Sequence, residues 1–325
     1  MNYKQSKILL LVSVLTLVAC NLSENVVAKP PQQQDLPTTP SILPNRSNTG
    51  DSATLLTYKI ETYDSQLMGA NRTYGVSLPP GYEQNPKQKY PVIFLLHGGH
   101  GYPSDWFIQK KGEALKTVEQ LYATGKLPPS IIITPDGYDK RGSSRYRDPE
   151  YIDGPNGKVS TAVGDELVKV VQNRYRTINN PDFWAIGGLS SGGWGAMNVG
   201  LHNLKHFSIL FSHSGYFQDK SGPTNSPIVY IKNIPTSATK RLRIYLDSGT
   251  ADIEEINEAK NFSNVLSELK VYNLLRQFPG SHTWQYWREH LADSLTFVGE
   301  QFKSAQIANM TGNLGVNQKK RTPNN

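Results

Sequence analysis

The chain has 325 residues, of which 37% are hydrophobic and 19% charged, and it contains one cysteine. A folded body of about 250 residues would bury roughly 70–75% of the surface that its unfolded chain exposes, so it needs no cross-links. A single cysteine excludes an intrachain disulfide framework and a cysteine-based zinc cluster. The formal net charge is +7, but much of the excess lies at the two ends, in Lys4, Lys7, Lys319, Lys320 and Arg321. Nucleic-acid binders carry a basic stripe on the folded domain, so no nucleic-acid partner is expected.

The first 20 residues are organised like a bacterial export signal. Residues 1–7 are short and basic, and residues 8–19 form an almost unbroken apolar run. That run is too short to span a bilayer, which needs about 20 residues, but its length suits a signal peptide. It ends in Leu-Val-Ala-Cys, which resembles a lipobox, so Cys20 is the expected lipidation site. The sequence therefore predicts an exported protein, lipid-anchored on the periplasmic or cell-surface side of a bacterial membrane; a plain secretory signal with a chance cysteine is the alternative.

Three segments of different composition follow the signal. Residues 21–52 are rich in Pro, Gln, Ser and Thr without an apolar period, which predicts a disordered, solvated tether. Residues 53–308 contain the periodic apolar segments of one folded domain, and residues 309–325 are expected to form a disordered basic tail. The mature protein would be held to the membrane by lipid rather than by a spanning helix.

The folded domain alternates apolar strands with helices. In chain order we predict strands at 55–61, 71–78 and 90–96, a helix at 106–122, a strand at 130–134, a helix at 160–175, a strand at 183–187, a helix at 191–202, strands at 207–212 and 241–246, a helix at 253–269, a strand at 272–278 and a helix at 287–303. Apolar strands separated by helices are typical of a parallel sheet that is covered on both faces. The sequence therefore predicts an α/β fold with a mostly parallel central sheet.

The segment Gly188-Leu189-Ser190-Ser191-Gly192 lies between a predicted strand and a predicted helix. The spacing G-x-S-x-G is weak by itself, but this context is that of a nucleophile elbow, a sharp turn that exposes the serine hydroxyl. Glycines two positions before and after the serine prevent a collision in such a turn. An ordinary glycine-rich turn is the alternative. A nucleophilic Ser190 would need a base, because its hydroxyl must lose a proton as it attacks.

Five histidines follow Ser190, and in this architecture the chain order is serine, acid, histidine. His282 lies in a loop directly after a predicted strand, where an imidazole can reach the carboxyl edge of the sheet. We predict His282 as the general base and keep His213, at the end of another strand, as a minor candidate. The other three are expected to be surface or packing residues: His202, His206 and His290.

Two aspartates between Ser190 and His282 compete for the role of the orienting acid. Asp247 ends a predicted strand, and Asp252 lies in the following loop, where it could also be a helix N-cap. Gly249 lets the chain bend back, which favours Asp252. Its carboxylate would fix the tautomer of the histidine and stabilise the imidazolium.

Acyl transfer also needs donors for the carbonyl oxygen, on which negative charge develops. One donor is expected to be the backbone N–H of Ser191, directly after the nucleophile. The other is expected in the loop after the early strand, with Gly99 preferred over its neighbours Gly98 and His100. Because the chain has no H-E-x-x-H motif, no cysteine cluster and no paired-histidine spacing, His97 is expected to be structural and no metal site is predicted.

Four segments in chain order resemble the motifs of the esterase D-like family of α/β-hydrolases. They read Leu-Leu-His-Gly-Gly at 95–99, Ile-Gly-Gly-Leu-Ser-Ser-Gly-Gly-Trp-Gly-Ala at 186–196, Asp-Ser-Gly-Thr-Ala-Asp at 247–252 and Gly-Ser-His-Thr-Trp-Gln-Tyr-Trp at 280–287. The resemblance extends over about residues 55–303. That family includes S-formylglutathione hydrolases, feruloyl and acetyl-xylan esterases, enterochelin esterases and antigen 85-like mycolyltransferases.

The resemblance implies an α/β-hydrolase fold and no metal or organic cofactor. It gives Ser190, Asp252 and His282 the triad positions, and Gly99 and Ser191 the oxyanion positions. This chain departs from the family pattern at Ser191, where methionine is frequent, but only the backbone N–H is expected to act there. The implied function is a serine carboxylic-ester hydrolase that works through an acyl-enzyme on a small-molecule or saccharide-linked ester. An acyltransferase of the same fold and a non-catalytic lipoprotein scaffold are the alternatives.

Two sequence features are candidates for contact with the substrate. Pockets are often lined by aromatic residues, so Trp106 or Tyr102 could face the ester, with core packing as the alternative. The polar segment 138–151 is expected to border the pocket, and Arg141, Arg145 or Arg147 could meet an acidic substrate, with solvated loop charges as the alternative.

Overall fold

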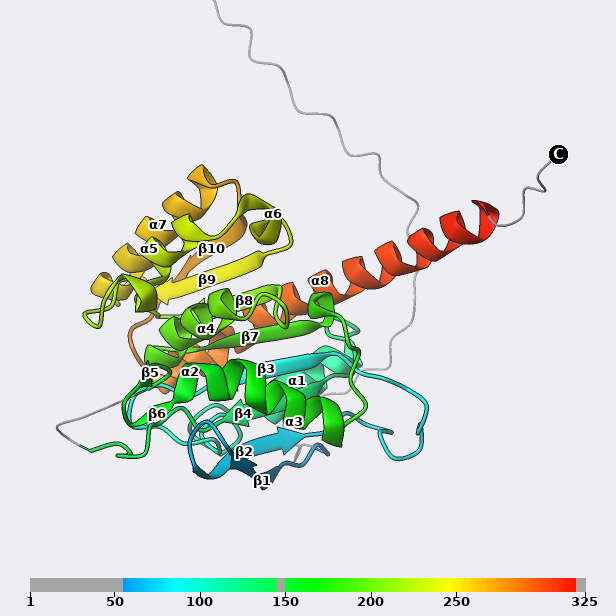
Figure 1. Ribbon diagram of the computed structural model, residues 1–325, viewed down its shortest axis with the longest axis horizontal. Helices are drawn as coiled ribbons and strands as arrows, with labels where there is room; N and C mark the ends of the chain where they lie inside the picture. Colours follow the sequence, from blue (N-terminus) through cyan, green and yellow to red (C-terminus); the bar gives the residue numbers. More distant parts are fainter. Residues whose placement is uncertain (1–54, 145–149, 320–325) are drawn as a thin grey trace, which may run out of the picture. The chain divides into compact units, whose positions relative to one another are not determined.

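A computed structural model describes residues 55–144 and 150–319, with side chains as far as residue 311 (Figure 1). The predicted signal with Cys20, the tether at 21–52, and Arg145 and Arg147 lie outside the described residues. Among the helices that the structure does describe, none is both long and apolar enough to cross a bilayer.

The centre of the fold is a twisted sheet. Within the described residues it contains eight strands in the spatial order β1 (Lys59–Ser65), β2 (Ala70–Ser77), β4 (Ile131–Pro135), β3 (Val92–Leu96), β7 (Trp184–Leu189), β8 (Ile209–His213), β9 (Arg243–Gly249) and β10 (Tyr272–Phe278). The strand pairs from β4 to β10 are parallel, whereas β2 pairs antiparallel with both β1 and β4. The prediction of a mostly parallel sheet is therefore confirmed. A separate hairpin joins β5 (Asp153–Gly154) to β6 (Gly157–Lys158).

Helices cover both faces of this sheet. The main ones are α1 (Ala114–Ala123), α4 (Ser191–His202), α7 (Ile253–Glu268), α8 (Trp284–Lys319) and a composite helix of α2 (Val159–Thr161), a π-helical turn (Ala162–Glu166) and α3 (Leu167–Arg174). In Figure 1, α3, α4 and α7 lie in front of the sheet and α8 crosses behind it, with α1 packed against α8. Short helical turns fill the connection between β8 and β9, including α5 (Pro227–Tyr230) and α6 (Thr236–Thr239).

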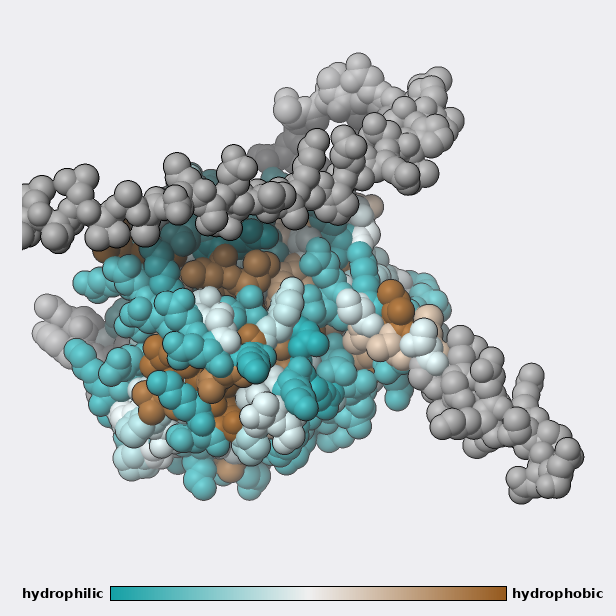
Figure 2. Space-filling view, turned by 90° about the horizontal axis from the view of Figure 1, so that it is seen from above, coloured by the Kyte–Doolittle hydropathy of each residue, from teal (hydrophilic) through white to brown (hydrophobic). Residues whose placement is uncertain are grey.

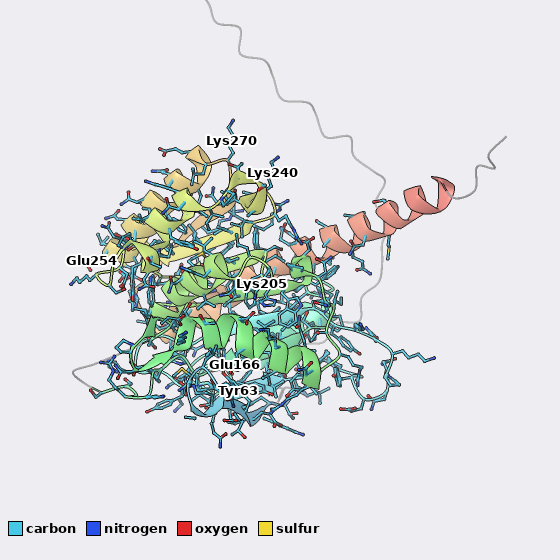
Figure 3. All side chains as sticks on the ribbon, viewed as in Figure 1. Tyr63, Glu166, Lys205, Lys240, Glu254 and Lys270 are labelled. Atoms are coloured by element: carbon cyan, nitrogen blue, oxygen red, sulfur yellow. The ribbon has the colours of Figure 1, made fainter. Side chains whose placement is uncertain are left out.

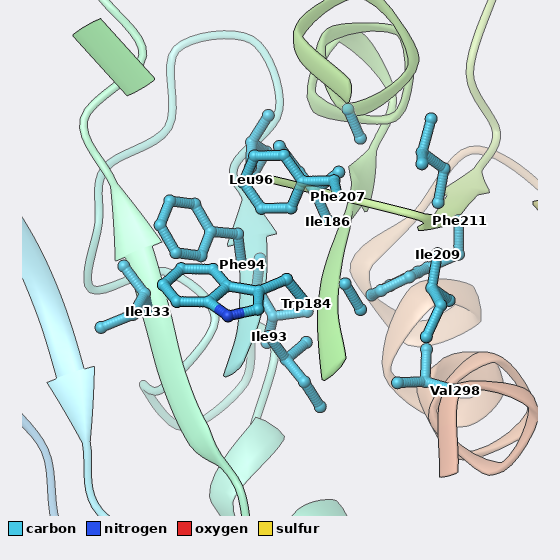
Figure 4. Close-up of a cluster of buried hydrophobic side chains, with 14 of the residues drawn as sticks. Ile93, Phe94, Leu96, Ile133, Trp184, Ile186, Phe207, Ile209, Phe211 and Val298 are labelled. Atoms are coloured by element: carbon cyan, nitrogen blue, oxygen red, sulfur yellow. The ribbon is translucent and has the colours of Figure 1, made fainter. Parts of the chain in front are cut away.

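The core lies between the sheet and the two helical layers. Every residue of β3 is buried, as expected for an apolar strand with helices on both faces. Figure 4 shows side chains of β3, β4, β7 and β8 interlocking with Phe207 and Val298. Each fully buried side chain of this size contributes about 1.5–3 kcal/mol, so this cluster fixes the central strands. The face in Figure 2 is mostly hydrophilic with scattered apolar patches.

Two predicted helices differ from the structure. The helix predicted at 106–122 begins only at Ala114, because Lys110 and Glu113 adopt positive φ angles of 67° and 46°, which no α-helix accommodates. The last helix starts at Trp284 and continues to Lys319, so the tail expected to be disordered from residue 309 is helical over its first part. Residues 284–319 contain no proline, and the helix propagates from a start that is packed against the sheet.

Candidate active site

The nucleophile elbow forms where β7 meets α4. Ser190 separates the two elements and has φ 53° and ψ −124°, a conformation that costs a non-glycine residue on the order of 1–3 kcal/mol. A Cβ on Gly188 would lie 2.5 Å from the carbonyl oxygen of Gly192, and a Cβ on Gly192 would lie 2.2 Å from that of His97. Both positions therefore require glycine, for the reason that the sequence motif predicts.

A continuous line of hydrogen bonds runs from Ser190 to Asp252. The Oγ of Ser190 lies 2.8 Å from Nε2 of His282, and Nδ1 of His282 lies 2.9 Å from Oδ2 of Asp252. The His282 side chain is 37% exposed, whereas that of Asp252 is only 5% exposed. The structure thus brings together the three residues that the sequence singles out, from three loops at the carboxyl edge of the sheet, and leaves the imidazole accessible.

Two adjacent loops hold the acid and the base in place. The N–H groups of Thr250 and Ala251 donate to the carbonyls of Phe278 and Gly280, so the loops after β9 and β10 are joined by backbone hydrogen bonds at 2.8 Å. A Cβ on Gly249 would lie 2.3 Å from the carbonyl oxygen of Gly280. The glycine is thus needed for this close approach rather than for the bend inferred from the sequence, since its φ is not positive.

Asp252 stands at the N-cap position of α7, but its side chain makes no capping hydrogen bond. Its carboxylate instead accepts hydrogen bonds from Nδ1 of His282 at 2.9 Å and from the hydroxyl of Ser248 at 3.4 Å. Burial would raise the pKa of Asp252, but the neighbouring Glu255, His282 and Ser214 outweigh burial and hold the pKa below its ordinary value. The carboxylate is therefore kept ionised beside the imidazole, which the N-cap alternative does not explain.

The competing candidates Asp247 and His213 are bonded to each other in the interior. Nδ1 of His213 lies 2.8 Å from Asp247, and Nε2 of His213 lies 2.9 Å from Oγ of Ser294. The hydroxyl of Tyr286 also donates to Asp247, at 3.1 Å. The side chains of His213 and Asp247 are 0% exposed, so no substrate can reach this set of groups. Their role is to join β8 and β9 to α8.

The loop at 97–101 packs directly on the elbow. A Cβ on Gly98 would lie 2.5 Å from Cδ1 of Leu189 and 3.3 Å from Cβ of Ser190, so a side chain has no room. Gly99 lines the same pocket as Ser190, and Ser191 opens α4 with its hydroxyl bonded to the buried Glu150. Both expected oxyanion donors thus lie beside the nucleophile, and their catalytic role stays a prediction.

His97 is a structural residue. The N–H of Gly137 donates to its Nε2 at 3.1 Å, so the ring carries its proton on Nδ1, which faces the carbonyl of Gly98 at 2.9 Å and Glu150 at 3.3 Å. The Tyr151 hydroxyl donates to the carbonyl of His97. The ring is buried and has a partner at both nitrogens, which agrees with the expected structural role.

The pocket above Ser190 has a volume of about 510 Å³. Its lining residues are Gly98, Gly99, His100, Gly101, Asp105, Lys111, Leu189, Ser190, His282, Thr283, Trp284 and Trp287. Trp284 and Trp287 meet edge to face, and Trp287 meets His282 in the same way, so two indoles shape the wall nearest the base. Lys111 pairs with the buried Asp105 at 2.9 Å. Sequence reasoning missed this pair, because Lys111 lies in a segment predicted to be helical and Asp105 directly precedes it.

The aromatic residues expected to contact substrate lie elsewhere. Trp106 is fully buried and donates its Nε1 hydrogen to the carbonyl of Leu96, so it belongs to the core. Tyr102 is 62% exposed and does not line the pocket. The segment 138–151 reaches the pocket wall through a 2.6 Å hydrogen bond between Ser143 and His100, whereas Arg141 pairs with Asp139. Of the three arginines named from the sequence, Arg141 is the one that the described residues include, and it pairs with an aspartate of its own loop.

One described cluster has the residue types of a metal site. Oxygens of Asp252 and Glu255 and a nitrogen of His282 lie within 4.8 Å of one another. The Nδ1 of His282 faces Asp252 at hydrogen-bond distance, so in this arrangement it carries a proton and has no lone pair for a cation. This geometry suits proton transfer rather than metal binding.

Comparison with known proteins agrees with this fold. Residues 65–298 match the family described as "Putative esterase". An acetyl esterase from Caldicellulosiruptor saccharolyticus is 23% identical over 271 residues, which cover 73% of this chain and 96% of that protein. An uncharacterized protein from Corynebacterium glutamicum is 22% identical over 244 residues, 69% of this chain and 56% of that protein. A solved structure of a ferulic acid esterase has a TM-score of 0.69 and 26% identity, and the match covers 77% of this chain and 100% of that one.

These matches define the class, which is that of the carboxylic ester hydrolases with the α/β-hydrolase fold. Because the family match covers most of the chain, the chain belongs to the "Putative esterase" family. The resemblance seen in the sequence is thereby confirmed. The chain spans nearly all of the acetyl esterase but little more than half of the Corynebacterium protein.

Proposed function

We propose that this protein is a serine carboxylic-ester hydrolase in which Ser190 is the nucleophile, His282 the general base and Asp252 the orienting acid. The observation that carries the proposal is the unbroken hydrogen-bond line Ser190–His282–Asp252, which begins at a strained, pocket-lining serine. Nucleophile, base and orienting group within hydrogen-bond reach of one another are the geometric signature of nucleophilic catalysis.

In the first step Oγ of Ser190 attacks the ester carbonyl carbon while Nε2 of His282 takes the hydroxyl proton. The carbonyl π electrons move to oxygen, and the N–H groups of Gly99 and Ser191 stabilise the resulting oxyanion. When the tetrahedral intermediate collapses, the imidazolium of His282 gives its proton to the leaving alcohol, and the acyl group stays on Ser190. Asp252 holds the Nδ1 proton of His282 and balances the positive charge that forms.

In the second step water replaces the alcohol. His282 takes a proton from the water as its oxygen attacks the acyl-Ser190 ester, and the second tetrahedral intermediate releases the carboxylic acid. The proton returns from His282 to Oγ of Ser190, so the enzyme is restored without a metal or an organic cofactor. Another alcohol entering in place of water would turn hydrolysis into acyl transfer.

The substrate class we propose is an ester of a small or aromatic carboxylic acid, linked to a small molecule or a saccharide. The similar acetyl esterase and ferulic acid esterase support this class, and so does the pocket wall formed by Trp284 and Trp287. We also propose that the enzyme is exported and lipid-anchored through Cys20, on the basis of the lipobox-like end of its signal.

The test is turnover of a panel of short acyl, aryl and sugar esters by the wild type and by Ser190→Ala. The proposal expects hydrolysis by the wild type and loss of activity in the variant, together with labelling of Ser190 alone by a serine-reactive phosphonate. An active Ser190→Ala variant would contradict the assigned nucleophile, and a wild type without phosphonate labelling would favour a non-catalytic scaffold. Product analysis with and without an acceptor alcohol separates a hydrolase from an acyltransferase.

A further inference from the structure

A second acidic side chain, Glu255, adjoins the hydrogen-bonded line Ser190–His282–Asp252. Glu255 lies in the first turn of α7, three residues after Asp252, which places the two carboxyl groups on the same side of the helix start. Oxygens of both carboxyl groups and a ring nitrogen of His282 lie within 4.8 Å of one another. Two carboxyl groups this close can share a proton in a hydrogen bond. Nothing in the proposed mechanism uses Glu255.

A hydrogen bond between two carboxyl groups requires a proton on one of them, because two carboxylates are both acceptors only. Asp252 already accepts from His282 and from Ser248, which favours its ionised form. The shared proton therefore belongs on Glu255. Burial, followed by the hydrogen bond to Asp252, raises the pKa of Glu255 to about 7, while the pKa of Asp252 is lowered.

The surroundings of Glu255 allow this proton to exchange with solvent. Glu255 is half-buried at a cavity of about 610 Å³. The other charged groups that line it are Asp219, Lys220, Glu254 and Glu258. Three of these four are acidic, which favours the neutral form of Glu255. Glu258 accepts the N–H of Phe217 and so has its own partner, whereas Glu254 projects outward from the start of α7 (Figure 3).

We propose that Glu255 is a positioning residue of the catalytic site: as a neutral acid it donates a hydrogen bond to Asp252 and keeps that carboxylate turned toward Nδ1 of His282. This inference rests on the proposed function. Above neutral pH Glu255 loses its proton, the two carboxylates repel each other, and the hold on Asp252 weakens. The wild type should therefore lose part of its activity above neutral pH, and this part of the loss should disappear when residue 255 cannot ionise.

The test compares Glu255→Gln, Glu255→Ala and the matched control Glu254→Gln, with kcat and KM measured from pH 5.5 to 9 on one ester. Glutamine keeps an N–H donor at every pH, so Glu255→Gln should match the wild type at pH 6 and exceed it about 2- to 5-fold at pH 8.5. Glu255→Ala should lower kcat about 3- to 10-fold at pH 6 with little change in KM. Glu254→Gln makes the same substitution at the same cavity, away from Asp252, and should follow the wild-type profile.

Two outcomes would overturn the inference. If Glu255→Ala matches the wild type at every pH, the hydrogen bond has no positioning role. If wild-type activity rises above pH 7 and Glu255→Gln lacks that rise, ionised Glu255 assists electrostatically and does not act as a donor. Ser190→Ala, measured alongside, separates this failure from failure of the proposed function, because only the latter would leave that variant active. Thermal unfolding of each variant verifies that it is folded.

Discussion

Two sets of serine, histidine and aspartate side chains in this molecule have nearly the same hydrogen-bond lengths. One is Ser190–His282–Asp252 at the pocket, and the other is Ser294–His213–Asp247 in the interior. They differ in access and in backbone conformation. Ser190 has a strained positive φ that presents its hydroxyl, whereas Ser294 lies inside α8 and donates to the carbonyl of its own helix at Leu291.

The difference shows that residue types and distances do not by themselves define a catalytic site. The buried set bonds its side chains to one another and links β8, β9 and α8, so its interactions contribute to the stability of the fold. The set at the pocket leaves the His282 side chain more than one-third exposed, so a substrate can reach the imidazole. We therefore expect matched substitutions in the two sets to separate activity from stability.

The largest expected effect is on the serines. Ser190→Ala should lower kcat/KM by about 10⁴-fold or more, because it removes the hydroxyl proposed to take the acyl group. Ser294→Ala should change kcat/KM less than about 3-fold but lower the free energy of unfolding by about 1–3 kcal/mol, because Nε2 of His213 loses its partner. Ester hydrolysis and urea denaturation measure the two effects. Loss of activity in a folded Ser294→Ala variant would contradict the distinction.

Substitutions of the two aspartates should separate activity from stability in the same way as those of the two serines. Asp252→Asn should lower kcat about 10³- to 10⁴-fold, because the imidazolium of His282 loses its counter-charge and its tautomer is no longer fixed. Asp247→Asn should lower the free energy of unfolding by about 1–3 kcal/mol through its buried contacts with His213 and Tyr286. Steady-state kinetics and denaturation on both variants test this; equal losses of kcat in the two variants would refute it.

One residue touches both sets and should have an intermediate effect. The hydroxyl of Ser214 helps to lower the pKa of Asp252 and accepts from Nε1 of Trp287 at 3.1 Å, while its backbone N–H donates to the carbonyl of Asp247 at 2.8 Å. Ser214→Ala keeps the backbone bond and removes the side-chain bonds. It should lower kcat about 3- to 10-fold with KM nearly unchanged. A change in KM alone would show that Ser214 acts on substrate binding instead.

The smallest effect concerns the pH dependence of stability. The folded-state pKa of Glu255 is raised from 4.5 to about 7, so between these values the folded state binds more protons than the unfolded state. Stability from this group is present below pH 4.5 and is lost as pH rises toward 7. Asp252, whose pKa is lowered, acts in the opposite direction and loses its contribution as pH falls below its ordinary value. Glu255→Gln should flatten the decline between pH 5 and 7 in urea denaturation, and Glu254→Gln should not.

The sequence predicted the fold class and the order of most elements because apolar strands and amphipathic helices have distinct periods. The helix after Ser190 has the predicted bounds, 191–202. The segment at 106–113 was predicted wrongly, because its apolar residues fit a helical spacing while its backbone turns repeatedly to pack Trp106 into the core. The sequence pattern does not predict these turns, because the residues with positive φ are Lys110 and Glu113 and not glycines.

Sequence patterns alone name the candidate catalytic residues: an elbow serine between two glycines, a loop histidine after a strand, and an aspartate between them in chain order. The folded structure adds which aspartate faces His282, that Glu255 lies beside this pair, and that Lys111, Asp105, Trp284 and Trp287 line the pocket. The two kinds of information differ in the sequence separation over which the underlying interactions act. Turn chemistry and periodicity act between neighbours along the chain, whereas hydrogen bonds that join residues 30 and 92 positions apart exist only after the strands of the sheet have aligned their carboxyl ends.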